Sequence, residues 1–205
     1  MRMDDSPPTN TPPTERSPDF VVRPIHGLIR SKARIDNADG ACLARVVDRG
    51  DTARAKVFQI VPTDDNGNPD RTRPLLSVRT TDSMLYELLM PDGEAFGVVE
   101  RVSGAVPIGG EHLMIRTAPD HEMTEIRETG HLWAALGSLV SVLAPVPVGL
   151  AKREFEVITN HRVATLTKRT GISGLRVEVY LEEPDPRIDT LTLLAAACIL
   201  REFLV

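Results

Sequence analysis

The fold is decided by one C-terminal stretch, DTLTLLAAACILREFL, at residues 189–204. Pro186 precedes it, and Asp189 or Thr190 is placed to cap the first free N–H groups of a helix. This helix is apolar nearly all round, which is typical of a helix buried in protein or inserted in a bilayer. Its apolar part, residues 191–200, is far shorter than the roughly 20 residues that a membrane span needs. We therefore expect the helix to be buried within the protein.

Upstream of this helix, short apolar runs alternate with polar residues and end at Gly, Pro, Asn or Asp, which predicts successive strands and turns. The clearest run is LRVEVYL at 175–181, where Leu175, Val177, Val179 and Leu181 share one face. Eight similar runs lie at 41–47, 56–61, 75–79, 85–90, 96–102, 112–117, 153–159 and 162–169. The pattern predicts a mainly antiparallel β fold around the terminal helix.

Hairpin turns are predicted between several of these runs. Asp39-Gly40 and Asp92-Gly93 supply the positive φ angles that tight hairpins require. Asp120-His121 and Asn160-His161 occupy equivalent places, although Asn and His tolerate positive φ less well. Their irregular spacing excludes a solenoid or a propeller, whose repeats keep a fixed period.

The length of 205 residues fits one domain and a tail. Residues 1–20 are rich in Pro, Ser and Thr and predict a disordered tail, while residues 21–205 predict a single barrel domain. The start of the chain lacks the apolar stretch of a secretory signal, so we expect a cytoplasmic protein. Cys42 and Cys198 have no metal-ligand spacing and predict two small hydrophobic side chains in a reducing compartment.

Three segments carry a family resemblance: RPLLSVR at 73–79, YELLMPDGEAFG at 86–97, and PDPRID at 184–189 leading into the terminal helix. Together with residues 163–169, they make the chain resemble the tubby-like barrel superfamily, in particular its bacterial branch related to the LURP-one and phospholipid scramblase families. The resemblance spans roughly 21–205. It implies a closed antiparallel barrel of about twelve strands threaded by the terminal helix. It also implies lipid binding, because tubby-like barrels include phosphoinositide binders.

Motifs for catalysis and metal binding are missing from the sequence. The five histidines show neither His-x-x-x-His nor His-x-His spacing, and no serine lies in a G-x-S-x-G elbow. The loop at 64–70 places oxygen-bearing side chains at alternate positions, but Pro69 and Leu75 stand where a helix-flanked calcium loop requires Gly and Glu. We expect no enzymatic activity, no metal and no cofactor.

One cluster of basic residues is a candidate site. It lies on or beside the last predicted strands, where pairing brings the cations together, and Arg and Lys donate charge-assisted hydrogen bonds to phosphate. Interleaved Glu154, Glu156 and Glu178 favour the alternative of a solvated, salt-bridged outer face. The candidate residues for an anionic lipid are Lys152, Arg153, Arg162, Lys168, Arg169 and Arg176.

A second apolar segment, at residues 131–144, has helical spacing and is stopped by Pro145 and Pro147. It predicts either a helix packed across one end of the barrel or a shallow membrane-contacting element with Leu132, Trp133 and Leu136 at the lipid headgroups.

The function predicted from the sequence is a non-enzymatic barrel that binds an anionic or lipidic ligand, or a protein partner, at the cytoplasmic face of the membrane. A scramblase-like membrane-active protein and a purely structural interaction module are the alternatives. The net charge of -5, with acids and bases interspersed, argues against nucleic acid as the main partner.

Overall fold

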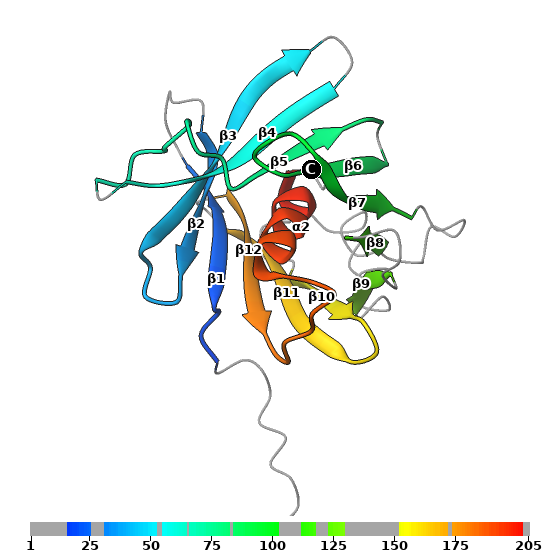
Figure 1. Ribbon diagram of the computed structural model, residues 1–205. Helices are drawn as coiled ribbons and strands as arrows, with labels where there is room; N and C mark the ends of the chain where they lie inside the picture. The colour runs from blue at the N-terminus through cyan, green and yellow to red at the C-terminus, as the bar shows by residue number, and fades with distance from the viewer. Residues whose placement is uncertain are drawn as a thin grey trace, which may run out of the picture.

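In the computed structural model, the described residues are 16–25, 31–52, 55–64, 66–82, 84–102, 112–117, 123–129, 152–171 and 174–202. They form an antiparallel sheet that closes on itself around a helix, α2 (Thr190–Glu202), drawn in red in Figure 1. The expected segment 131–144, with Leu132, Trp133 and Leu136, lies outside the described residues, as do residues 1–15 of the expected tail.

The barrel has twelve strands, and each pairs with the next along the chain. Their bounds are β1 Phe20–Pro24, β2 Ser31–Asn37, β3 Cys42–Thr52, β4 Ala55–Pro62, β5 Leu76–Thr80, β6 Leu85–Leu89, β7 Ala95–Arg101, β8 His112–Arg116, β9 Thr124–Thr129, β10 Lys152–Ile158, β11 Arg162–Gly171 and β12 Gly174–Leu181. The predicted antiparallel barrel around a C-terminal helix is confirmed.

Closure of the barrel depends on the pairing of β1 with β12, the first strand with the last. Phe20 lies opposite Val179, and Val22 lies opposite Val177. Asp19 extends this contact, because its N–H donates to the carbonyl of Val179 (2.9 Å) and its carboxylate accepts from the N–H of Leu181 (2.8 Å). Closure pairs both edges of the sheet, which would otherwise present free N–H and C=O groups.

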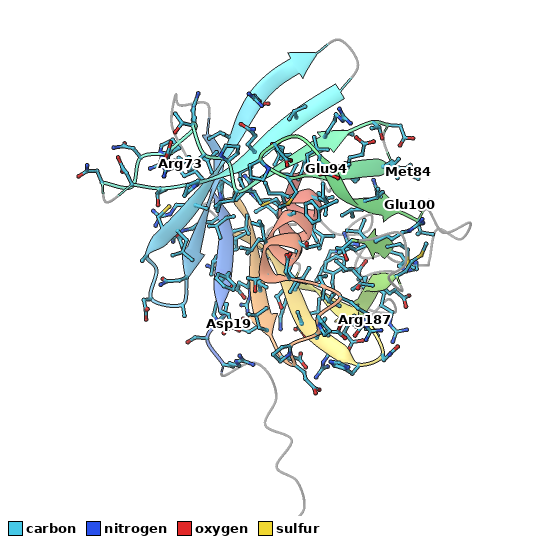
Figure 2. All side chains as sticks on the ribbon, in the orientation of Figure 1. Asp19, Arg73, Met84, Glu94, Glu100 and Arg187 are labelled. Atoms are coloured by element: carbon cyan, nitrogen blue, oxygen red, sulfur yellow. The ribbon has the colours of Figure 1, made fainter. Side chains whose placement is uncertain are left out.

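The interior is filled by α2 and by the inward side chains of the strands (Figure 2). Leu193, Ala196, Ala197 and Leu200 are only 4%, 0%, 0% and 2% exposed, which confirms the predicted burial of the helix. Its start is capped as predicted, because the N–H of Thr192 donates to the Asp189 carboxylate over 2.6 Å. Within the described residues, we find no helix that combines the length and the apolar character needed to cross a bilayer.

Each of the nine expected runs overlaps a strand. The predicted turns that fall within the described residues are confirmed. Gly40 and Gly93 have φ angles of 80° and 91°, and residues 159–161 join β10 to β11 as a hairpin. The Asp120-His121 turn lies outside the described residues. Both cysteines are free; Cys198 is buried, as expected, whereas Cys42 is half-buried.

Three strands, β1, β2 and β9, were not among the expected runs. In β9, the inward positions are Thr124, Ile126 and Glu128, so two of the three buried side chains are polar. Alternation of apolar and polar residues is the main signal for a half-buried strand, and β9 lacks it. The short β1 and the charged β2 give similarly weak signals.

Candidate anion-binding site

The barrel divides the six predicted cations between its two faces. Strand residues alternate in direction, and Phe155 and Leu166 are fully buried core residues opposite each other in β10 and β11. Arg153 and Lys168, also opposite each other, share the inward face with them, and Lys168 is only 5% exposed. By the same alternation, Lys152, Arg169 and Arg176 lie on the outer wall. Arg162, at the start of β11, is 52% exposed and pairs with Glu156 and Glu182 outside the barrel.

Arg153 is held inside the barrel by a buried carboxylate. Its Nε donates to Glu128 Oε1 over 2.6 Å, and its Nη2 contacts Glu128 Oε2. The guanidinium carbon also lies 5.7 Å from the centre of the Phe155 ring. This charged interior group is separated by the sheet from the cations on the outer wall.

Three of the outer cations form a row across neighbouring strands, which we call the C-terminal row: Lys152 of β10, Arg169 of β11 and Arg176 of β12. Lys152 lies directly opposite Arg169, and Arg169 lies directly opposite Arg176. Like charges in directly opposite positions destabilise a sheet. The three cations of the row therefore repel one another unless anionic groups lie close to them.

Two carboxylates offset part of this charge. Glu154 contacts Lys152, while Glu178 pairs with both Arg169 Nε and Arg176 Nη2 at 2.9 Å. Three cations against two carboxylates leave the C-terminal row with one net positive charge. The predicted alternative of a salt-bridged face is thus present in the same strands as the row.

A groove of about 420 Å³ runs along the outer wall beside this row. Its most buried lining residue is Thr167, which is 2% exposed. The groove also holds the hydroxyls of Thr165 and Tyr180. Its charged lining residues are four cations, Arg16, Lys152, Arg162 and Arg169, and three carboxylates, Glu154, Glu182 and Glu183.

Tyr180 lies in this groove as a hydrogen-bond donor. Its hydroxyl donates to Glu178 Oε2 over 3.0 Å. Burial raises the pKa of Tyr180 above its usual value, and the hydrogen bond to the negatively charged Glu178 raises it further. The phenol therefore stays protonated at neutral pH.

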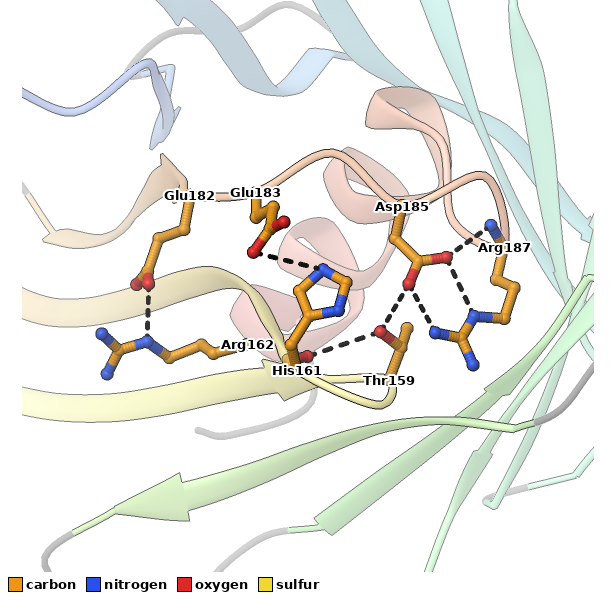
Figure 3. A network of polar contacts seen from close by, with 7 residues as sticks. All are labelled: Thr159, His161, Arg162, Glu182, Glu183, Asp185 and Arg187. Carbon is orange, nitrogen blue, oxygen red and sulfur yellow. Dashed lines mark hydrogen bonds and ion pairs between the residues drawn. The ribbon is translucent and has the colours of Figure 1, made fainter.

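Arg162, which also lines the groove, is held by ion pairs. Its Nε donates to Glu182 Oε2 over 2.6 Å (Figure 3). Its Nη1 donates to Glu156 Oε1 over 3.2 Å. Thr165 donates to the other oxygen of Glu182 over 2.8 Å. The hydrogen bond to Glu182 raises the pKa of Arg162. Because two carboxylates already hold Arg162, the open anion-binding part of the groove is its C-terminal-row end.

A separate polar network fixes the connection from β12 to α2 (Figure 3). Asp185 accepts hydrogen bonds from Arg187 Nε (2.9 Å), Arg187 Nη2 (2.6 Å) and the Thr159 hydroxyl (2.6 Å). Nearby, His161 Nε2 lies 3.9 Å from Glu183 Oε2. The hydrogen bonds from Arg187 hold the pKa of Asp185 well below its usual range. The network ties the start of α2 to the β10–β11 hairpin.

This network predicts an acid-sensitive anchor for the helix. Because the pKa of Asp185 is lower in the folded chain than in the unfolded chain, its carboxylate stabilises the fold above the ordinary aspartate pKa of about 3.9. That contribution is lost as the pH falls through the folded pKa. We expect Asp185→Asn to lower the Tm at pH 7, and the difference from the parent chain to shrink below about pH 4. Thermal unfolding at pH 7 and pH 3 checks this, and an equal difference at both pH values would contradict it.

The sequence did not single out four of the groove-lining residues, Arg16, Thr165, Thr167 and Tyr180. Thr165 and Thr167 alternate with Leu166, so strand alternation already placed them on the outer face, but no charge singled them out. Arg16 lies outside the predicted domain, and no local signal places it beside β12. Among the described residues, no group of three or more His, Cys, Asp or Glu side chains is arranged to hold a metal ion.

Comparison of the chain with models of protein families, with curated proteins and with solved structures found no match.

Proposed function

We propose that this chain is a non-catalytic, tubby-like barrel that binds a phosphate-bearing ligand, an anionic phospholipid headgroup at the cytoplasmic face of the membrane. The observation that carries the proposal is the C-terminal row, in which Lys152, Arg169 and Arg176 lie directly opposite one another on the outer wall. A bound phosphate relieves the repulsion within the row and accepts charge-assisted hydrogen bonds from it.

The groove supports the same ligand class. Thr165, Thr167 and Tyr180 add hydroxyl groups to the lining of the groove beside the row. The side chains of Lys152, Arg169 and Arg176 are 37%, 40% and 47% exposed, so a ligand reaches them from solvent. Glu154 and Glu178 already pair with these cations, which favours a weakly held, salt-sensitive anion.

The position of the row along the barrel fits a membrane-facing end. Thr129 pairs with Glu154, so β9 ends and β10 begins at the end of the barrel where Arg201 of α2 contacts the carbonyl of Leu175. The proposed membrane-contact residues Leu132, Trp133 and Leu136 lie between Thr129 and Lys152 in the sequence, outside the described residues.

Charge-neutral variants of the row test the proposal. Each Lys or Arg near an anionic membrane contributes about 1 kcal/mol, or about fivefold in affinity. We expect Arg169→Gln/Arg176→Gln to bind phosphatidylserine-containing vesicles about 25-fold more weakly in a sedimentation assay. Binding by the parent chain should fall as salt rises and should be absent on pure phosphatidylcholine vesicles.

The matched control is Arg79→Gln on β5, because Arg79 is also on the outer wall and also pairs with a carboxylate, Glu87. It should bind vesicles like the parent chain. Competition by inorganic phosphate distinguishes a free phosphate ligand from a lipid headgroup. If Arg79→Gln loses as much vesicle binding as Arg169→Gln/Arg176→Gln, or if the parent chain binds no vesicles, the lipid proposal is wrong. The structural interaction module is then the remaining alternative. A requirement for detergent to extract the protein from membranes would instead favour the scramblase-like alternative.

A further inference from the structure

A second row of cations crosses the N-terminal strands. Arg23 of β1 lies directly opposite Arg34 of β2, and Arg34 lies directly opposite Arg45 of β3. Their strand neighbours Val22, Ala33 and Ala44 are at most 4% exposed and fill the core, so the three arginines point to the outer wall. We call them the N-terminal row. Like charges again face one another directly.

The two rows meet at the seam where the barrel closes. Val21 lies opposite Glu178, and Val22 lies opposite Val177. Continuing this antiparallel register by one residue places Arg23 beside Arg176. The two rows then form one line across six neighbouring strands, β10, β11, β12, β1, β2 and β3. Figure 1 shows where these strands lie in the barrel. We call this line the cationic belt: Lys152, Arg169, Arg176, Arg23, Arg34 and Arg45.

The belt keeps more positive charge than its C-terminal half alone. In the N-terminal row, Asp36 is 2% exposed, accepts from Arg34 Nε over 2.6 Å and contacts Arg23. Arg45 has no carboxylate partner among the described residues, and its Nε is buried without a hydrogen-bond partner. With Glu154 and Glu178 in the other row, six cations are contacted by three carboxylates, which leaves a net charge of three.

We infer that the cationic belt is one docking surface for an anionic bilayer, and that it engages several headgroup phosphates at once. This inference rests on the proposed function and extends it from one row to two. Six neighbouring strands at about 4.8 Å spacing cover about 24 Å along the curved wall of the barrel, which is wider than any single phosphate group. An array of phosphates held at a surface matches this span.

A bilayer fits the belt better than a single-stranded nucleic acid does. Binding of single strands relies on exposed aromatic rings on which bases stack. The exposed large hydrophobic residues of the described chain are aliphatic or Met: Leu43, Leu75, Met90 and Met123.

Arg45 gives the cleanest test, because its replacement breaks no ion pair among the described residues. We expect Arg45→Gln in the full chain to bind phosphatidylserine-containing vesicles about fivefold more weakly, and Arg34→Gln/Arg45→Gln about 25-fold more weakly. The slope of log binding affinity against log salt concentration should become less steep by a similar amount for each cation removed. Arg45→Lys, which keeps the charge, should bind close to the parent chain. Arg79→Gln is again the control, and equal Tm values for Arg45→Gln and the parent chain confirm folding.

The outcomes separate this inference from the proposed function. If Arg169→Gln/Arg176→Gln loses vesicle binding while Arg45→Gln retains it, the belt is wrong and the C-terminal row stands alone. If none of these variants changes binding, both proposals fall. A single-stranded oligonucleotide that displaces the protein from vesicles at a concentration below that of lipid phosphate would overturn the bilayer as partner. Lower binding of Arg45→Gln to vesicles, with unchanged binding of inorganic pyrophosphate, supports the inference.

Discussion

Ala196→Asp is expected to abolish cooperative folding of the barrel. Ala196 is fully buried in α2, between Ala195 and Ala197, which are also 0% exposed. An aspartate there buries a charge among apolar groups, or a protonated carboxyl without room for partners, at a cost of several kcal/mol. That is comparable to the whole stability of about 5–15 kcal/mol for a small domain. Urea unfolding followed by far-UV circular dichroism measures the loss.

The matched control is Ala41→Asp, at an exposed position in the β2–β3 turn. It introduces the same side chain into solvent and should change the unfolding free energy by less than about 0.5 kcal/mol. A folded Ala196→Asp chain with stability close to the parent would contradict the placement of α2 at the centre of the barrel.

Glu128→Gln is expected to lower the unfolding free energy by about 3–5 kcal/mol. Glu128 is 2% exposed and pairs with Arg153 inside the barrel. Its neutralisation removes a negative charge from the interior face on which Arg153 and Lys168 lie directly opposite each other. Because the interior screens charge poorly, this loss exceeds that of any ion pair on the outer wall. The midpoint of urea unfolding, with the slope held in common, measures it.

Glu87→Gln is the surface counterpart, because it breaks the exposed Arg79–Glu87 pair of β5 and β6. We expect it to lower the unfolding free energy by less than about 1 kcal/mol. Replacing both partners of the interior pair with apolar residues, Glu128→Leu/Arg153→Met, should recover part of the loss seen in Glu128→Gln. A single variant no worse than Glu87→Gln would show that Glu128 is not needed to balance the interior charge.

Much of the fold was readable from local patterns. The terminal helix, its Asp189 cap and the nine alternating runs depend on side-chain periods of 3.6 and 2, which neighbouring residues set by themselves. The strand β9 was not predicted, because the buried polar residues Thr124 and Glu128 interrupt the alternation of apolar and polar residues. The tubby-like resemblance remains a prediction, and so does the membrane contact of Trp133.

The sequence predicted only part of the candidate site. Sequence reasoning grouped Arg153 and Lys168 with Lys152 and Arg169 because all four are basic and lie in adjacent runs. The structure places the first two inside the barrel, where Arg153 meets Glu128, and leaves the other two on the outer wall. Adjacent residues of a strand point to opposite faces of the sheet, so Arg153 and Lys168 lie on the other face from their sequence neighbours Lys152 and Arg169. The sequence did not indicate Arg34 and Arg45 as site residues, because they lie far along the chain from the basic C-terminal strands.

The sequence by itself determined that an apolar helix of this length is buried and that alternating strands surround it, because hydrophobicity and periodicity are properties of short segments. Only the tertiary structure decided which cations face one another. The register of each strand pair depends on hydrogen bonds between distant parts of the chain. The closure of β1 on β12 depends on them too, and its register, continued by one residue, places Arg23 beside Arg176. A shift of one residue in any of these pairs would send its row of cations to the other face of the sheet.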